Sequence, residues 1–311
     1  MPLNLPDNLP AVELLKKEQI FVMDDLRAST QDIRPLKILI LNLMPLKITT
    51  ETDLIRLLSN SPLQIEIEFL GLSSHTPKNT PVEHLMMFYT NFSRVKDTFY
   101  DGMIITGAPV EMLPFRDVTY WDELTEIFDW ARTHVTSTFY ICWGAQAALH
   151  HFYGINKYPL DKKLFGVFRH TLNDPAFPLF RGFDEAFYAP HSRHTTILAE
   201  EISKCPELAI LSESDEAGVY IVASRGGREF YVTGHSEYAP LTLHNEYTRD
   251  MEKGMESVEP PLNYYRNNDP GQPPLVQWRS HANLLYINWL HYFVYQATPY
   301  KIEEIEKLRD L

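Results

Sequence analysis

Residues 137–153, S-T-F-Y-I-C-W-G-A-Q-A-A-L-H-H-F-Y, decide the fold predicted for this chain. The residues through Ile141 are β-branched and aromatic, which predicts a buried strand. From Ala145 onward the residues are helix formers without Pro or Gly, which predicts a helix. Only C-W-G separates the two patterns, so the strand must turn into the helix within a sharp corner.

Such a corner places the side chain of Cys142 at the N-terminus of the following helix. Free backbone N–H groups and the helix dipole favour an anion there, so a thiolate and a later oxyanion would both be stabilised. Gly144 suits the corner because a residue without Cβ can approach neighbouring backbone closely. The pattern predicts a nucleophile elbow with sulfur in place of oxygen. The other cysteine, Cys205, is interpreted as a small buried residue or a surface thiol.

Length and composition limit the classes of protein to consider. The chain has 311 residues, 44% of them hydrophobic, which is enough for one large α/β domain with a full core. Two cysteines predict a reducing compartment, and the N-terminus lacks a signal-peptide pattern, so we expect a cytoplasmic protein without membrane spans. The formal charge of −13 argues against nucleic acid and anionic membranes as partners. A small anionic ligand would need only a local basic cluster.

Strand and helix patterns alternate in the first half of the chain. Strands are predicted at 36–43, 63–70, 100–107 and 138–141, and helices at 54–58, 81–95, 121–134 and 145–153. This order predicts a doubly wound, mostly parallel sheet with flanking helices. The chemistry of such sheets lies beyond the carboxyl ends of the strands, where the loops at 44–50, 107–117 and 142–144 should converge.

The second half is less regular. Short strands are expected at 164–172, 186–189, 208–211, 219–224 and 229–233, with helices at 241–253 and 280–297. We expect the Pro-rich residues 1–35 to form an arm with a short helix at 11–17. Residues 36–311 would then form a single α/β domain.

His235 is the best candidate base for Cys142, because it follows a buried strand and a glycine at the start of a loop. Glu237 lies two residues later, on the same side of an extended segment, where it can hydrogen-bond the imidazole and fix its tautomer. A histidine alone is more often structural, so the combination with Cys142 is what indicates catalysis. His191 and His194 form too weak a pattern for a metal site, and we predict no metal.

The motifs C-x-G-x-Q at 142–146 and H-x-E at 235–237 resemble those of the class I glutamine amidotransferase superfamily. Those enzymes usually have Gly two residues before the nucleophile, where this chain has Tyr140. The surrounding sequence is more similar to the homoserine O-acyltransferases, the homoserine transsuccinylase family, over nearly the whole chain. The matching stretches are 39–47, 106–111, 140–146, 190–193 and 234–238.

The resemblance implies a class I glutamine amidotransferase-like fold, a ping-pong acyl transfer without a cofactor, and a homodimer. Cys142 would attack the thioester of an acyl-CoA, here acetyl-CoA as co-substrate. His235, oriented by Glu237, would then activate the side-chain hydroxyl of L-homoserine. The product would be an O-acylated homoserine for methionine biosynthesis.

The resemblance also implies an amino-acid site lined by Lys163, Ser192 and Arg249. Homoserine is a zwitterion, and the bidentate guanidinium of Arg249 suits its carboxylate. Lys47 would lie near the nucleophile and the acyl-CoA. Without the resemblance, Lys163 and Arg249 would be interpreted as solvated surface charges.

Glu111 is expected to determine the acyl donor. In the family that this sequence resembles, a glycine at this place is typical of succinyl-using members and a glutamate of acetyl-using members. Succinyl carries a free carboxylate, which a glutamate at about 4 Å would repel by on the order of 4 kcal/mol. The expected donor is therefore acetyl-CoA, with succinyl-CoA as the alternative. In the other interpretation, Glu111 caps a loop or pairs with Arg116.

Two further functions are open at this point. A glutamine amidotransferase or γ-glutamyl hydrolase would use the same triad, although Tyr140, Glu111 and Ser192 argue against it. A binding protein on a degenerate amidotransferase fold would have an unreactive Cys142, and the intact Cys, His and Glu argue against that.

Overall fold

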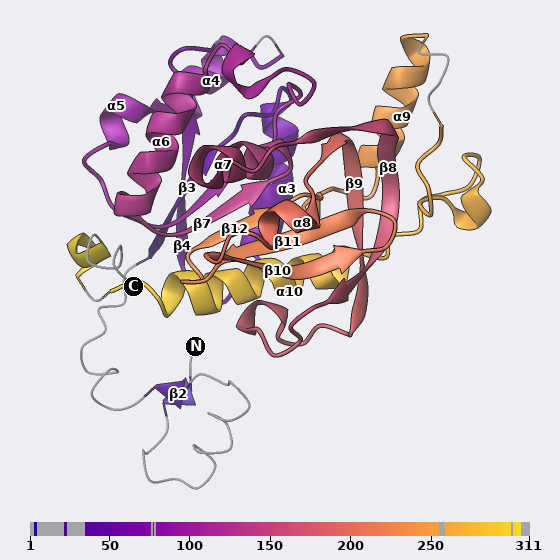
Figure 1. Cartoon of the computed structure of the whole chain (residues 1–311). Coiled ribbons are helices and arrows are strands. Elements are labelled where there is room, and N and C mark those ends of the chain that lie inside the picture. The colour runs from indigo at the N-terminus through magenta and orange to yellow at the C-terminus, as the bar shows by residue number, and fades with distance from the viewer. Residues whose placement is uncertain are drawn as a thin grey trace, which may run out of the picture.

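The computed structural model describes residues 3–4, 22–23, 35–75, 77, 79–254, 259–299 and 301–305. A sheet of ten strands forms the centre of the molecule (Figure 1). Its strands are β3 (Leu36–Leu41), β4 (Ile65–Gly71), β5 (Tyr89–Asn91), β6 (Tyr100–Ile105), β7 (Val135–Ile141), β8 (Tyr158–Leu172), β9 (Ala186–Thr196), β10 (Leu208–Ser214), β11 (Gly218–Ser224) and β12 (Glu229–Val232). Their order across the sheet is β5-β4-β3-β6-β7-β12-β11-β10-β8-β9.

Neighbouring strands from β5 to β12 are parallel, whereas those from β12 to β9 are antiparallel. The predicted doubly wound, mostly parallel sheet is thereby confirmed, with an antiparallel extension formed by the second half of the chain. The carboxyl ends of β3, β6 and β7 lie side by side, because Leu41 pairs with Ile105 and Ile105 with Tyr140. The loops that follow these strands therefore meet at one edge of the sheet.

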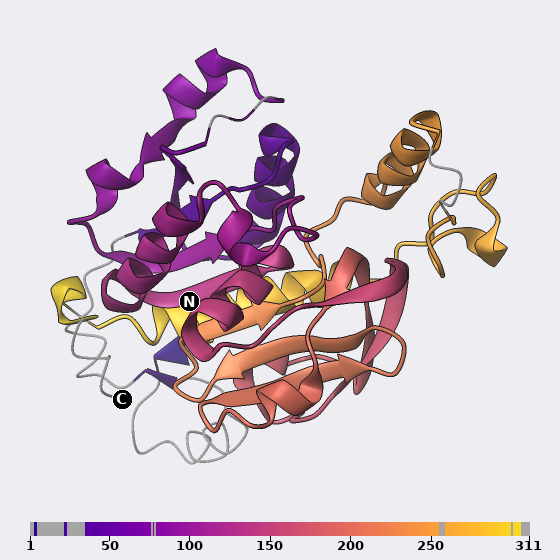
Figure 2. The same ribbon diagram turned by 45° about the horizontal axis from the view of Figure 1, so that its top comes forward.

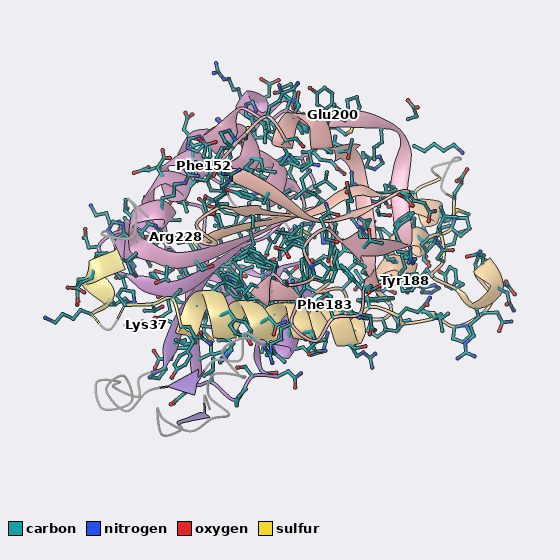
Figure 3. All side chains as sticks on the ribbon, turned by 60° about the horizontal axis from the view of Figure 1, so that its bottom comes forward. Lys37, Phe152, Phe183, Tyr188, Glu200 and Arg228 are labelled. Carbon is teal, nitrogen blue, oxygen red and sulfur yellow. The ribbon has the colours of Figure 1, made fainter. Side chains whose placement is uncertain are left out.

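Helices cover both faces of the sheet. They are α3 (Lys47–Leu58), α4 (Val82–Phe88), α5 (Phe92–Val95), α6 (Trp121–His134), α7 (Trp143–Tyr153), α8 (Ala199–Ile202), α9 (Thr242–Glu252) and α10 (Arg279–Asn288). Alternate residues of β3 pack into two separate hydrophobic clusters, Ile38 and Ile40 in one and Leu39 and Leu41 in the other. The first cluster includes apolar residues of α3 and α10, and the second those of α6 and α7. In Figure 3, α10 runs along its face of the sheet with Phe183 beside it.

The single helix predicted over 81–95 is wrong in its middle. Here the chain forms α4, then β5, then α5. Tyr89, Thr90 and Asn91 pair in parallel with residues 69–71 of β4 and extend the edge of the sheet. Aromatic and β-branched residues favour strands, and the available edge of β4 decides the outcome over the helical pattern on either side.

Other boundaries differ by less. The strand predicted at 186–189 continues to Thr196 as β9, which brings the 190–193 stretch into the sheet. The helix predicted at 54–58 begins earlier, at Lys47. The helix predicted at 280–297 is divided in the structure. Its first part is α10, and a π-helix, η4, follows over Trp289–Tyr295.

The predicted N-terminal arm is described only at β1 (Leu3–Asn4) and β2 (Val22–Met23), which pair in parallel. Its predicted helix at 11–17 lies outside the described residues. Across the described part of the chain, the helices are all too short or too polar to cross a lipid bilayer.

Candidate active site

Cys142 occupies the corner between β7 and α7. Its φ of 50° and ψ of −119° are a strained backbone conformation for a residue with a side chain. Two backbone hydrogen bonds hold the corner: the Cys142 N–H donates to the carbonyl of Val232 (2.7 Å), and the Gln146 N–H donates to the carbonyl of Cys142 (3.2 Å). The side chain is 7% exposed. The structure thus has the predicted elbow, with Cys142 at the N-terminus of α7.

Two glycines allow the elbow to pack against the loop after β6. A Cβ on Gly144 would lie 2.6 Å from the carbonyl oxygen of Thr106, which is closer than such atoms approach. A Cβ on Gly107 would lie 3.1 Å from the Cβ of Cys142. The convergence of these loops was predicted from the strand order and is confirmed. The loop after β3 joins them, because the Leu43 N–H donates to the hydroxyl of Thr106 (2.8 Å).

His235 and Glu237 follow β12 and reach the elbow from the side of the antiparallel strands. His235 Nδ1 lies 2.7 Å from Glu237 Oε1, and the imidazole is close enough to Cys142 for the two side chains to interact electrostatically. The ring stacks on Tyr238, with centroids 4.2 Å apart. Burial lowers the pKa of His235, but Cys142 and Glu237 raise it through their charges and hydrogen bonds, and the net pKa is well above its ordinary value. The raised pKa favours the protonated imidazole beside Cys142, and the structure brings the three predicted residues together.

The three residues expected at the amino-acid site also come together, around an acidic side chain that the sequence prediction did not include. Glu246 Oε1 accepts hydrogen bonds from Lys163 Nζ (2.8 Å) and Ser192 Oγ (2.7 Å), and it lies 3.7 Å from Arg249 Nη2. Asp250 pairs with Arg249 (2.7 Å) and lies 3.4 Å from Lys163 Nζ. We call these five residues the polar cluster.

The polar cluster lies next to the triad. Glu246, Glu237 and Cys142 are among the charges that raise the pKa of Tyr238, after the larger effect of its burial. The His235 N–H donates to the carbonyl of Pro190 (2.8 Å), two residues before Ser192, so β9 joins the cluster to the triad. Glu246 and Asp250 could have been found from the sequence, because they lie three residues before and one residue after Arg249 on a helix that was predicted.

Glu111 points toward β9. Its Oε2 accepts hydrogen bonds from the His194 N–H (2.9 Å) and the Thr195 hydroxyl (3.2 Å). The interpretation that Glu111 pairs with Arg116 is wrong, since the donors of β9 bind this carboxylate. Lys157 Nζ donates to the main-chain carbonyl of Glu111 and holds the loop in place.

Arg193 is a buried cation beside both Glu111 and Cys142. It is 1% exposed, and its guanidinium donates to the carbonyls of Thr195 (2.6 Å) and Ala217. Burial lowers the pKa of Arg193 to about 10, against the raising effect of Cys142 and Glu111, so it stays charged at neutral pH. The sequence prediction gave this residue no role, although it lies in the matched stretch 190–193.

Lys47 is buried at the first residue of α3, with 5% exposure. Its ammonium donates to the carbonyl of Asn42 and lies 5.1 Å from the ring centroid of Tyr89. Burial lowers the pKa of Lys47 to about 8, and the charge of Glu51 opposes this shift.

The buried Lys47 should make the stability of the protein depend on pH between about 8 and 10.5. In this range the unfolded chain binds a proton at Lys47 that the folded chain lacks, so the free energy of unfolding rises with pH. Relative to Lys47→Met, the wild type should gain on the order of 3 kcal/mol across the range. Urea unfolding at several pH values measures the difference. Lys37→Met, at an exposed residue of β3, is the control. The assignment would be contradicted if the difference in free energy of unfolding between wild type and Lys47→Met were as independent of pH as the difference between wild type and Lys37→Met.

His191 and His194 have other partners in the structure. His191 Nε2 lies 3.0 Å from His170 Nε2 in the core, and the His194 N–H binds Glu111. Within the described residues, His, Cys, Asp and Glu side chains nowhere gather in threes or more as metal ligands would. That the protein works without a metal stays a prediction.

A family model described as homoserine O-succinyltransferase matches residues 2–300. The chain belongs to this family. A homoserine O-acetyltransferase of Bacteroides fragilis is 68% identical over 305 residues, which cover 98% of this chain and 100% of that protein. A homoserine O-acetyltransferase of Parabacteroides distasonis is 66% identical over 311 residues and 100% of both chains. Because its family consists of homoserine acyltransferases, the chain is an enzyme, as predicted.

Solved structures show the same fold in a different class of enzyme. A glutamine amidotransferase of Thermotoga maritima matches this family member with a TM-score of 0.56, over 84% of this chain and 99% of its own. The two sequences are only 11% identical, so the likeness shows the fold alone. It confirms the predicted amidotransferase-like architecture.

Proposed function

We propose that this chain is a homoserine O-acetyltransferase that transfers the acetyl group of acetyl-CoA to the side-chain hydroxyl of L-homoserine. The observation that carries the proposal is the placement of the polar cluster beside the Cys142, His235 and Glu237 triad. A nucleophile with its own base thus lies next to opposite charges suited to a zwitterionic amino acid. The names of the relatives support the same function.

In the first half-reaction, the Cys142 thiolate attacks the carbonyl carbon of acetyl-CoA. The N–H of Trp143, in the first turn of α7, has no intrahelical partner and is suited to hydrogen-bond the oxyanion. The intermediate then collapses to a thioester on Cys142. Coenzyme A leaves as a thiol with the proton of His235.

In the second half-reaction, His235 changes its role. The acetylated Cys142 no longer carries a negative charge, which removes one cause of the raised pKa of His235. Neutral His235 then takes the proton of the homoserine hydroxyl, whose oxygen attacks the thioester. The products are O-acetyl-L-homoserine and the regenerated thiolate, beside a protonated His235 held by Glu237.

We assign the homoserine carboxylate to Arg249 and Lys163, and its ammonium group to Glu246 and Asp250. In the unliganded arrangement these groups neutralise one another, so binding exchanges internal ion pairs for ion pairs with the ligand. Ser192 keeps Glu246 in place through its hydroxyl.

Glu246→Gln is expected to lower kcat/KM for L-homoserine by about tenfold or more, because a charged partner of the ammonium group is lost. In a ping-pong mechanism kcat/KM for acetyl-CoA reports only the first half-reaction, so it should change less than about twofold. Steady-state kinetics with both substrates varied measures the two values. Glu252→Gln, at an exposed position of the same helix, is the control. Equal losses for both substrates would contradict the assignment.

Homoserine O-succinyltransferase is the second candidate, because the description of the matching family model favours it. Comparing thiol release from acetyl-CoA and succinyl-CoA tests the two candidates directly. We further propose a cytoplasmic homodimer in methionine biosynthesis that needs no cofactor and no metal. Residues 36–311 would form its single domain and residues 1–35 an arm.

A further inference from the structure

A cavity of about 630 Å³ lies beside the active site, at the carboxyl ends of the strands on the β5 side of the sheet. Pro109 and Val110, in the loop after β6, line one part of it, and Arg94 of α5 lines another. The strand order β5-β4-β3-β6 places these two parts three strand spacings apart, or about 14 Å. The cavity is therefore elongated across the sheet edge.

One end of the cavity is lined by the loop that packs against the elbow. Pro109 and Val110 lie between Gly107, whose added Cβ would lie 3.1 Å from the Cβ of Cys142, and Glu111, the proposed donor-specificity residue. Leu43 and Lys47 complete this end. A ligand lying in the cavity could therefore place one terminus at Cys142.

The charge of the cavity wall differs from that of the whole chain. The chain contains 41 Asp and Glu residues, yet among the described residues that line the cavity none is acidic. The ionisable bases there are Lys47, Arg94 and His75. Two carboxylates lie nearby but are already bound. Glu51 accepts the Tyr89 hydroxyl (2.6 Å), and Glu123 accepts the N–H groups of Ser73 (2.7 Å) and Ser74 (2.8 Å).

The apolar part of the wall lies between these basic residues. It consists of Leu43, Met44, Leu72, Leu85 and Met86. Arg94 is exposed and makes no hydrogen bond or ion pair with any residue in the described part of the chain. The wall thus offers an apolar surface between the loop beside the elbow and an available guanidinium.

We propose that this cavity binds the coenzyme A part of the acyl donor, with the thioester at Pro109 and Lys47, the pantetheine arm along the apolar wall, and phosphate at Arg94. The proposal rests on the proposed acetyl-CoA-dependent function. It places the donor and homoserine on opposite sides of the elbow, since Figures 1 and 2 show α4 and α5 far from α9.

Calorimetric binding of desulfo-coenzyme A, which has no thiol to react, tests the proposal in the full-length protein. Arg94→Glu should weaken binding by about tenfold or more, and Arg94→Gln by less. Arg279→Glu, an exposed charge reversal at the start of α10, is the matched control and should bind like the wild type. Because Arg94 is exposed, these variants should fold, which circular dichroism checks.

Kinetics separate failure of this site from failure of the function. The Arg94→Glu variant should raise KM for acetyl-CoA and leave the KM for S-acetylpantetheine, which lacks the phosphates, within about twofold. If the Arg94→Glu variant bound desulfo-coenzyme A as tightly as the wild type and transferred acetyl groups normally, the cavity assignment would be overturned, whereas the proposed function would stand. Wild-type protein that neither binds desulfo-coenzyme A nor releases thiol from acetyl-CoA would overturn the proposed function as well.

Discussion

Replacing Cys142 with Ala is expected to reduce acetyl transfer by about 10⁴-fold or more. Without the sulfur no thioester forms on the enzyme, and His235 loses one of the two partners that raise its pKa. Alanine is small enough for the elbow, and the backbone hydrogen bonds of residue 142 do not involve its side chain. The loss should therefore be chemical rather than structural.

Mass spectrometry distinguishes this result from a simple loss of binding. Wild-type protein given acetyl-CoA without homoserine should gain one acetyl group on Cys142. Cys205→Ala, which removes the other cysteine, should gain the same group and keep its activity. Normal turnover by Cys142→Ala, or acetylation of that variant to the wild-type level, would end the nucleophile assignment.

Glu111→Gly is expected to change the donor preference in favour of succinyl-CoA by several hundredfold or more. The Glu111 carboxylate now takes the His194 N–H and the Thr195 hydroxyl, beside the buried guanidinium of Arg193. Removing it leaves the His194 N–H without this acceptor and removes a negative charge that interacts with Arg193. A succinyl carboxylate can occupy the place that the glutamate carboxylate leaves.

Glu111→Gln separates charge from size in this prediction. The amide keeps the volume of the side chain but cannot repel a carboxylate, so it should shift the preference by less than Glu111→Gly. Values of kcat/KM for acetyl-CoA and succinyl-CoA in the three proteins measure both effects. An unchanged donor ratio in Glu111→Gly would show that this residue does not line the acyl pocket.

The local pattern around Cys142 was sufficient to predict the elbow, and the alternation of strand and helix patterns predicted the parallel half of the sheet. A strand pattern, C-W-G and a helix pattern follow one another directly, and few backbone conformations connect them. No local pattern predicts the strand at Tyr89–Asn91. Its conformation depends on pairing with the edge of β4, which the sequence of this stretch does not reveal. The extension of β9 likewise depends on pairing with β8.

The candidate site also contains contacts that local sequence predicts and contacts that depend on tertiary packing. The contact between His235 and Glu237 was predicted from an extended segment, but residues 235–238 form a turn, in which the Tyr238 N–H donates to the His235 carbonyl (3.3 Å). The pairing was therefore predicted correctly, whereas the backbone conformation behind it was not. Lys163 and Glu246 are 83 residues apart in sequence, and only the packing of α9 beside β8 and β9 brings them together. Arg193 was missed because an arginine in a strand gives no sign that it is buried near the nucleophile.

The most direct measurement is the release of free thiol from acetyl-CoA and from succinyl-CoA, each with and without L-homoserine. We predict continuous release from acetyl-CoA only when homoserine is present, and a single enzyme equivalent without it. Preferred use of succinyl-CoA would contradict the role of Glu111. Failure of homoserine to stimulate release from either donor, together with hydrolysis of glutamine, would contradict the proposed acyl transfer itself.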